Sequence, residues 1–310
     1  MNIVNTKSSI IKSYKNDFRK NYSLYIMILP VVAFYIIFCY RPMYGLLLGF
    51  KDYRPGLGIL GSKWVGLEKF VSFIKSPYIG RLVKNTIILS ITDFVFSFPA
   101  PIILALLLNE ISSVRFKKVV QTISYFPHFI STVVICGLLV QFSSSSGIFN
   151  DIRSLLGLQR IPLLQQPELF RPIYIASGIW QGIGWGSIIY LAAITGVDQQ
   201  LYEAAALDGA GRLRRCIHVT LPSIRNTIVI LIIMNSAHIL DVGSEKILLI
   251  YNPSTYVTAD VISTFVYRRG LVDGDYSFST AIGFFNSVVS LILVLLSNKI
   301  ADKVADYSLF

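Results

Sequence analysis

Six long apolar runs constrain this chain more than any other feature of its sequence. A helix needs about 20 consecutive apolar residues to cross the hydrocarbon core of a bilayer. The runs are Leu24–Tyr40, Thr86–Leu108, Val119–Phe142, Ile173–Ile194, Ile224–Leu240 and Ala281–Asn298. Because hydrocarbon offers no water to bond, backbone groups within such runs must pair inside the segment, which favours helices. The sequence therefore predicts an all-α, polytopic membrane bundle with six transmembrane helices.

The composition agrees with a membrane protein. Hydrophobic residues make up 54% of the 310 residues, charged residues only 15%, and the mean hydropathy is +0.61. A net charge of +11 fits basic loops at lipid headgroups better than nucleic-acid binding. We expect a cytoplasmic segment at residues 1–23, one membrane domain at 24–300 and a cytoplasmic tail at 301–310. No small-residue cleavage site follows the first run, so we expect this run to stay in the protein as a span and not to be removed as a signal peptide.

The positions of Lys and Arg predict the orientation, because basic residues concentrate in short cytoplasmic loops. The turn Arg115-Phe116-Lys117-Lys118 and the cluster Arg212, Arg214 and Arg215 indicate that both termini are cytoplasmic, although the loop 41–84 is basic too. The predicted location is the plasma or inner membrane, with multiple passes. The three cysteines, Cys39, Cys136 and Cys216, are too scattered for a disulfide framework or a metal site.

Smaller elements are predicted between the runs. Residues 67–74 form a short amphipathic helix before the second run, and residues 251–276 form an ordered turn region. Pro99 and Pro101 in the second run and Pro127 in the third are expected to kink their helices, because proline frees a carbonyl group. Such kinks suit a protein that alternates between two openings, but they also occur in static bundles.

The polar segment between the fourth and fifth runs has the features of a docking surface. It reads Glu203-Ala204-Ala205-Ala206-Leu207-Asp208-Gly209. Its alanines give a slim helix that another protein can approach, and alanine is the best helix former. Glu203 adds a fixed charge, and Gly209 permits a backbone conformation or a close approach that side chains forbid. Pro222, further along, suits the first turn of a following helix.

This segment resembles the coupling loop of ABC importer permeases. The pattern is Glu-Ala-Ala, three residues, glycine, nine residues, an aliphatic residue, one residue and Leu-Pro, with Val219 where isoleucine is usual. Segments 179–186, 190–194, 235–239 and 281–287 are similar to the carbohydrate-uptake branch. The resemblance covers most of residues 20–300 and points to polysaccharide- and oligosaccharide-import permeases related to the lipoprotein-associated permease of Gram-positive bacteria. It does not identify the sugar.

The resemblance implies a type I ABC importer permease fold that moves oligosaccharides by alternating access. A coupling helix at about 200–213, with Glu203, Ala204, Ala205, Asp208 and Gly209, would dock on a cytoplasmic ATPase dimer. That dimer would bind ATP and Mg, so no cofactor, metal or catalytic residue is expected in this chain. The other implied partners are a second related permease chain, an extracellular or periplasmic solute-binding protein and membrane lipid. No metalloprotease motif or P-loop is found in the sequence.

Polar side chains within the runs are candidates for the sugar pathway. They cost free energy in a bilayer and are usually kept for function or for helix contacts. Sugar hydroxyls need donors and acceptors, and an aromatic surface suits the sugar ring. Trp180, Gln181 and Asn235 are preferred, because the resemblance places the cavity at the spans that flank the coupling loop. Asn235, His238 and Asp241 share one helix face by spacing. The full candidate set is Trp180, Gln181, Asn235, His238, Asn286 and Asp93.

Other interpretations remain open for these residues and for the chain. Asp93 can instead bond a neighbouring helix, and Trp180 and Trp185 can pack helices or anchor the membrane interface. Gly182, Gly184 and Gly186 fit close packing better than a phosphate loop. The alternative functions are a permease for a non-sugar solute, such as an amino acid or phosphate, and a membrane scaffold without transport.

Overall fold

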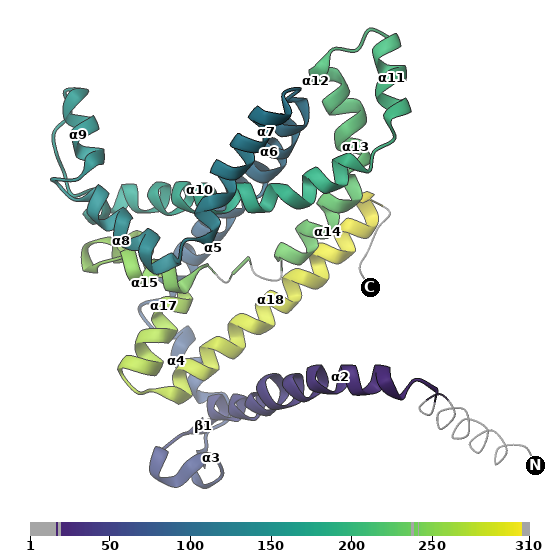
Figure 1. Cartoon of the computed structure of the whole chain (residues 1–310). Coiled ribbons are helices and arrows are strands. Elements are labelled where there is room, and N and C mark those ends of the chain that lie inside the picture. The colour runs from purple at the N-terminus through teal and green to yellow at the C-terminus, as the bar shows by residue number, and fades with distance from the viewer. Residues whose placement is uncertain (1–16, 18–19, 237–238, 241, 306–310) are drawn as a thin grey trace, which may run out of the picture.

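The chain folds into a helical bundle, as predicted (Figure 1). The computed structural model describes residues 17, 20–236, 239–240 and 242–305, and only the backbone of 301, 304 and 305. Two-residue strands β1 (Lys51–Asp52) and β2 (Lys63–Trp64) pair antiparallel, with Lys51 opposite Trp64. Short 3-10 or π segments carry η labels.

The helical elements follow one another with short connections. From the N-terminal side they are α2 (Tyr22–Phe34), η1 (Tyr35–Tyr40), η2 (Arg41–Phe50), η3 (Pro55–Leu57), α3 (Gly58–Gly61), α4 (Glu68–Ile74), α5 (Ile79–Ser97), α6 (Pro99–Glu110), α7 (Val114–Tyr125), η4 (Phe126–Phe129), α8 (Thr132–Ser143) and α9 (Ile148–Leu155). The remainder are η5 (Leu163–Gln165), α10 (Pro167–Thr195), α11 (Gln199–Leu207), α12 (Arg212–Arg215), η6 (Cys216–Thr220), α13 (Leu221–Ser223), α14 (Arg225–Ser236), α15 (Ser244–Ile250), η7 (Pro253–Thr255), α16 (Tyr256–Ala259), α17 (Ile262–Tyr267), η8 (Arg268–Val272) and α18 (Tyr276–Ala305).

The helices account for the predicted runs with different boundaries. Within the described ranges, four helical segments are long and apolar enough to span a membrane: Tyr22–Phe50, Ile79–Glu110, Thr132–Leu155 and Tyr276–Ile300. The pair Arg212–Ser223 and Arg225–Ser236, which is bent by 62°, makes a fifth candidate when its two helices are counted as one broken span. Helix α10 contains the fourth predicted run over its whole length, but its glycines and Gln181 make it less apolar than these.

The prediction that the third run forms one continuous helix is wrong. The run divides into α7, η4 and α8, with a break at Ile130–Ser131. Pro127 lies in the tight turn η4, where its missing N–H and its ring interrupt the regular helix. Ser131 then restarts the chain as the N-cap of α8, because its hydroxyl accepts a hydrogen bond from the Val134 N–H. Pro127 therefore has a larger effect than the expected kink.

The prolines of the second run are tolerated within one span. Pro99 is the first residue of α6, directly after Phe98, and the span from Ile79 to Glu110 continues through it. The fifth run was predicted to end at Leu240, but helix α14 is described as far as Ser236, and Ile239 and Leu240 lie in a turn. The predicted amphipathic helix is confirmed as α4, while the predicted turn region 251–276 is mostly short helices, η7 to η8.

Helix α10 crosses the middle of the bundle and packs closely through two glycines. A Cβ atom on Gly184 would lie 2.0 Å from the Ser124 carbonyl oxygen of α7, and one on Gly186 would lie 2.9 Å from Pro101 Cγ of α6. A Cβ on Gly182 would meet no atom within 4 Å. The close-packing interpretation therefore holds for Gly184 and Gly186 but not for Gly182.

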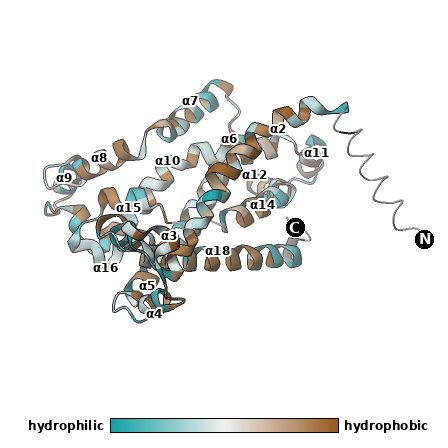
Figure 2. Ribbon diagram, turned by 90° about the horizontal axis from the view of Figure 1, so that it is seen from below, coloured by the Kyte–Doolittle hydropathy of each residue, from teal (hydrophilic) through white to brown (hydrophobic). Residues whose placement is uncertain are grey.

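The first span lies apart from the rest of the bundle. Figure 1 shows α2 extending away from the other helices, and η2 at its end packs on α18. None of the residues of α2 is buried. In Figure 2 the ribbons of α2 and α18 are brown over much of their length, which marks hydrophobic residues along both helices. Such helices suit lipid or another membrane protein.

The two ends of the bundle differ. Helices α11 and α12 lie at one end with the C-terminal end of α18, here called the α11 end (Figure 1). The opposite end, the α4 end, carries α4, α9, the β hairpin and α15 to α17. Its connections are fixed by a fully buried carboxylate, Asp260, whose Oδ2 accepts hydrogen bonds from Arg81 at 3.0 Å and Arg268 at 2.8 Å. Burial alone lowers the pKa of Arg268, but hydrogen bonds to Asp260 and Tyr251 raise it above its usual value.

Candidate functional site

A polar cavity, partly open at the surface of the chain, lies between α5, α10 and α14. It has a volume of about 310 Å³, and its polar lining includes Ser90, Asp93, Ser97, Tyr174, Tyr190 and Asn235. Ser97 donates a hydrogen bond to Asp93 Oδ1 at 2.8 Å, one turn away on α5. Asn235 donates to the Leu231 carbonyl oxygen at 2.7 Å, within its own helix α14. The cavity thus brings together two of the predicted pathway residues, Asp93 and Asn235.

Lys246 is a charged residue beside this cavity that the sequence analysis did not select. It is 8% exposed, and its ammonium donates to the Tyr174 carbonyl oxygen at 2.8 Å. The same ammonium lies 4.6 Å from the centre of the Tyr174 ring, a cation–π contact. Asp93 is near enough to attract it electrostatically. A lysine within the apolar stretch of α15, Ser244–Ile250, was the available signal, but it lies beyond the end of the fifth run.

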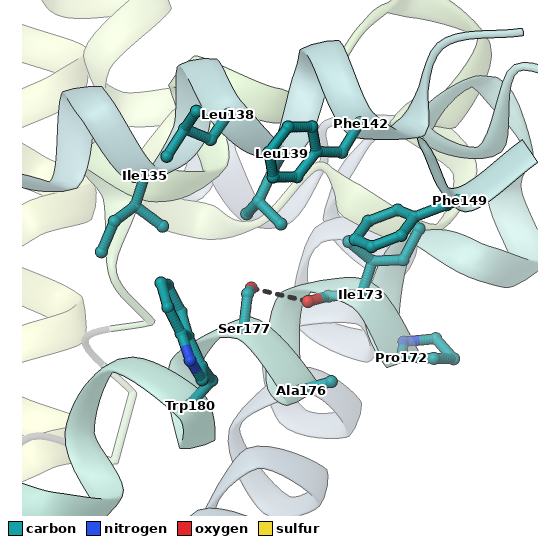
Figure 3. A pocket seen from close by; sticks show the side chains of 10 residues that line it. All are labelled: Ile135, Leu138, Leu139, Phe142, Phe149, Pro172, Ile173, Ala176, Ser177 and Trp180. Atoms are coloured by element: carbon teal, nitrogen blue, oxygen red, sulfur yellow. Dashed lines mark hydrogen bonds between the residues drawn. The ribbon is translucent and has the colours of Figure 1, made fainter. Parts of the chain in front are cut away.

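Trp180 and Gln181 lie outside the polar cavity. Trp180 lines an apolar groove of about 580 Å³ between α8 and α10, together with Leu138, Phe142 and Phe149 (Figure 3). Gln181 donates to the Ile130 carbonyl oxygen at 3.3 Å. That carbonyl lies at the break before α8. Gln181 therefore bonds a backbone acceptor that has lost its partner because the helix is interrupted there. The structure therefore does not bring Gln181 and Asn235 to one cavity.

The remaining candidates occupy other positions. Asn286 lies in a third groove, of about 470 Å³ and almost wholly apolar, between α5, α14 and α18. Trp185 stacks on His128, with ring centres 4.6 Å apart and planes at 3°, which agrees with a packing role. His238 and Asp241 lie outside the described residues, so their predicted shared face with Asn235 stays a prediction.

The predicted coupling helix forms as α11, shorter than expected at Gln199–Leu207. Asp198 caps it, because its carboxylate accepts a hydrogen bond from the Gln200 N–H at 2.9 Å. Asp208 follows as the C-terminal cap, and Gly209 has φ +73°, the left-handed conformation that glycine adopts without strain. No atom lies within 4 Å of where a Gly209 side chain would begin. Gly209 is therefore required here for its backbone angle.

The surface of α11 is open and partly apolar. Glu203 and Ala204 are exposed, Ala205 is half-buried, and the neighbouring side chains Leu207 and Leu213 are 91% and 73% exposed. Leucines this exposed are unusual on a polar loop. A hydrogen bond attaches helix α11 to the bundle: the hydroxyl of Tyr202 lies 3.0 Å from the hydroxyl of Thr220. An ion pair adds a second contact, because Nε of Arg212 lies 3.8 Å from Oε2 of Glu110 at the end of α6.

A continuous path connects this surface to the polar cavity. From α11 the chain passes through α12, η6 and α13, bends by 62° at Ile224, and continues as α14 to Asn235. Pro222 occupies the first turn of α13, as its position in the sequence predicts. Helix α11 and one wall of the cavity are therefore joined by a short helical stretch of the chain.

Known proteins resemble the chain over almost its whole length. The family model "Binding-protein-dependent transport system inner membrane component" matches residues 78–306. The chain is 46% identical to the polygalacturonan/rhamnogalacturonan transport system permease protein YteP of Bacillus subtilis, covering 93% of this chain and 90% of YteP. It is 44% identical to Protein LplB of the same organism, covering 93% and 91%.

A solved structure shares both fold and sequence with the chain. A chain in the crystal structure of a bacterial alginate ABC transporter, in complex with a periplasmic protein bound to an alginate pentasaccharide, superposes with a TM-score of 0.88. The two chains are 45% identical, and the match covers 95% of this chain and 99% of the other. The chain therefore belongs to the binding-protein-dependent transport system inner membrane component family and is a multi-pass permease of the type I fold.

Proposed function

We propose that this chain is one permease subunit of an ABC importer that carries acidic oligosaccharides across the cell membrane. The observation that carries the proposal is the helical path from the exposed surface of α11 to Asn235 in the polar cavity. Such a path converts movement of an attached ATPase into a change of cavity shape. Transporters commonly hold their substrate near the middle of the membrane, between such moving parts.

The acidic substrate class is supported by the relatives and by one residue. YteP is named for polygalacturonan and rhamnogalacturonan, and a solved relative serves the import of the acidic polysaccharide alginate. Lys246 contributes a cation beside the cavity, held by Tyr174. A buried ammonium favours a substrate carboxylate electrostatically, while Asp93, Ser97 and Asn235 provide hydrogen-bonding groups for hydroxyls.

Three kinds of protein partner complete the proposed importer. A cytoplasmic ATPase dimer binds ATP and Mg and docks on Glu203, Ala204, Ala205, Asp208 and Gly209. A second, related permease chain closes the pathway, and the unburied surface of α2 supports a protein or lipid neighbour there. A solute-binding protein delivers the sugar at the α4 end. We propose that the α11 end is cytoplasmic, with both termini, because it carries Arg212, Arg214 and Arg215.

The proposal is tested by reconstituting the transporter in proteoliposomes with its binding protein. ATP hydrolysis and uptake are measured with oligogalacturonides and with neutral oligosaccharides of the same length. We expect the acidic sugars to stimulate both activities and the neutral sugars to have little effect. Stimulation by neutral sugars alone would contradict the acidic class. Hydrolysis that responds to no sugar, but to another solute, would contradict the sugar importer itself.

A further inference from the structure

Helix α9 is the last part of the apolar segment Thr132–Leu155. Unlike α8 it is sharply amphipathic, and it lies beyond Phe142, where the third predicted run ends. At 100° per residue, Ile148, Phe149, Ile152, Leu155 and Leu156 gather on one side of its axis. Leu155 and Leu156 are 87% and 72% exposed. The opposite side carries Asn150, Asp151, Arg153 and Ser154. With two charges in eight residues, α9 is a poor extension of α8 into hydrocarbon.

One residue of the polar side, Asn150, is held by the loop that surrounds α9, whereas Ile148, Ile152 and Leu155 of the apolar side are exposed. Asn150 is fully buried and donates hydrogen bonds to the carbonyl oxygens of Ser144 and Ile161, both at 2.7 Å. The side-chain oxygen Oδ1 of Asn150 accepts a hydrogen bond from the Ile161 N–H at 3.1 Å. Asn150 thus closes residues 144–161 into one unit and sets the rotation of α9.

The apolar side of α9 continues the apolar surface of two spans. Phe149 contacts Phe142 of α8, with ring centres 5.9 Å apart in an edge-to-face arrangement. Both rings line the apolar groove between α8 and α10 shown in Figure 3. Trp180, on the opposite wall of that groove, is about half exposed. Figure 1 shows α9 beyond the end of α8, at the margin of the molecule.

We propose that α9 is an interfacial helix that inserts its apolar side into the surrounding lipid at the α4 end of the bundle. Amphipathic helices of this kind lie at the boundary between headgroups and acyl chains. Arg153 and Arg160 flank the apolar side, while Asp151 pairs with Arg160 at 2.7 Å. The remaining positive charge favours anionic headgroups, and arginine reaches them while its stem stays apolar.

Lipid fits this surface better than a protein that binds reversibly. A solute-binding protein must leave after each delivery, and its departure would return four aliphatic side chains and an aromatic ring to water. Exposed apolar patches of that kind are avoided unless something covers them. Lipid covers the neighbouring span surfaces at all times, and the groove lined by Phe149 connects directly to them.

The experiment places an environment-sensitive fluorescent amino acid at Leu155 or, as the matched control, at Ser154 on the polar side. The complete transporter is held in nanodiscs of phosphatidylethanolamine and phosphatidylglycerol. Quenching is compared for lipids with a nitroxide at the top of the acyl chain and for aqueous iodide. We expect the lipid nitroxide to quench position 155 at least about twofold more than position 154, and iodide to show the reverse order.

Three results would overturn the proposal. Equal quenching at both positions would show that α9 does not insert. Shielding of position 155 from both quenchers would show that the second permease, and not lipid, covers the apolar side of α9. If iodide quenching at position 155 disappears only when the binding protein is added, that protein covers the apolar side of α9.

A second measurement uses the unmodified chain in the same nanodiscs, without binding protein. Leu155 and Leu60, in α3, are 87% and 82% exposed in the isolated chain. Hydroxyl-radical oxidation should be several-fold lower at Leu155 than at Leu60, because lipid covers only the first. Equal oxidation of the two leucines would contradict lipid insertion even if a labelled variant failed to assemble.

Discussion

The hydroxyl of Tyr202 on α11 lies 3.0 Å from the hydroxyl of Thr220, which is almost completely buried at the end of η6. This contact joins the coupling surface to the helical path that leads to the cavity. Tyr202→Phe removes one hydrogen bond of about 0.5–1.5 kcal/mol. We expect the amount of sugar imported per ATP to fall about two- to tenfold, while Thr220→Ser, which keeps a hydroxyl, retains coupling. Uptake and hydrolysis measured together check this, and unchanged coupling in Tyr202→Phe would show that the contact carries no movement.

The polar cavity gives a second prediction, about substrate affinity. Asn235→Ala removes an amide from the cavity, whereas Asn286→Ala changes an amide in a separate apolar groove. Losing one hydroxyl partner costs about 0.5–1.5 kcal/mol, so Asn235→Ala should raise the KM for uptake about two- to tenfold. Asn286→Ala should leave the KM unchanged. The reverse pattern in transport assays would place the pathway in the other groove.

Close packing of α10 on α7 gives a third prediction. In Gly184→Ala the added methyl would lie 2.0 Å from the Ser124 carbonyl oxygen, so the two helices must separate. We expect a large loss of folded protein, seen as low membrane abundance and a lowered Tm. Gly182→Ala, two residues away in the same helix, meets no atom within 4 Å and should behave as the unmodified chain. Equal tolerance of both substitutions would contradict this packing.

The buried carboxylate at the α4 end gives a fourth prediction. Asp260→Asn leaves Arg81 and Arg268 without their shared charge partner. Breaking a buried ion pair lowers the free energy of unfolding by about 3–5 kcal/mol. Because both arginines are partly exposed, we expect a loss at the lower end of this range. Asp273→Asn breaks an exposed pair with Arg269, which is worth about 0–1 kcal/mol. Thermal unfolding in detergent should therefore separate the two variants clearly.

The sequence was sufficient to predict a bundle of apolar helices and a short helix near residues 200–213, which is α11. Apolar length predicted the bundle. Gly209 was expected to allow either an unusual backbone angle or a close approach, and the structure shows the first of these. The break at Ile130–Ser131 was not predicted, because hydropathy continues across it and only the combination of Pro127 with the Ser131 cap ends the helix.

The cavity was harder to predict than the helices. Asp93 and Asn235 were selected and lie together, but Gln181 faces the break before α8 instead. A polar residue in a span signals that a partner exists, yet it does not say whether that partner is substrate or an unpaired backbone carbonyl. Lys246 was missed because its burial depends on how α15 folds back beside α8 and α10, which spacing along the chain does not reveal.

The central claim is that α11 transmits ATPase movement to the cavity, and sugar-stimulated ATP hydrolysis by Glu203→Lys tests it most directly. Reversing the charge of Glu203 at a docking surface opposes the partner's complementary charge, which costs several kcal/mol. Glu68→Lys, an equally exposed reversal on α4 at the other end, is the matched control. With membrane abundance equal in both variants, the account predicts a sharp loss of stimulated hydrolysis in Glu203→Lys and normal stimulation in Glu68→Lys. Normal stimulation in Glu203→Lys would contradict the account.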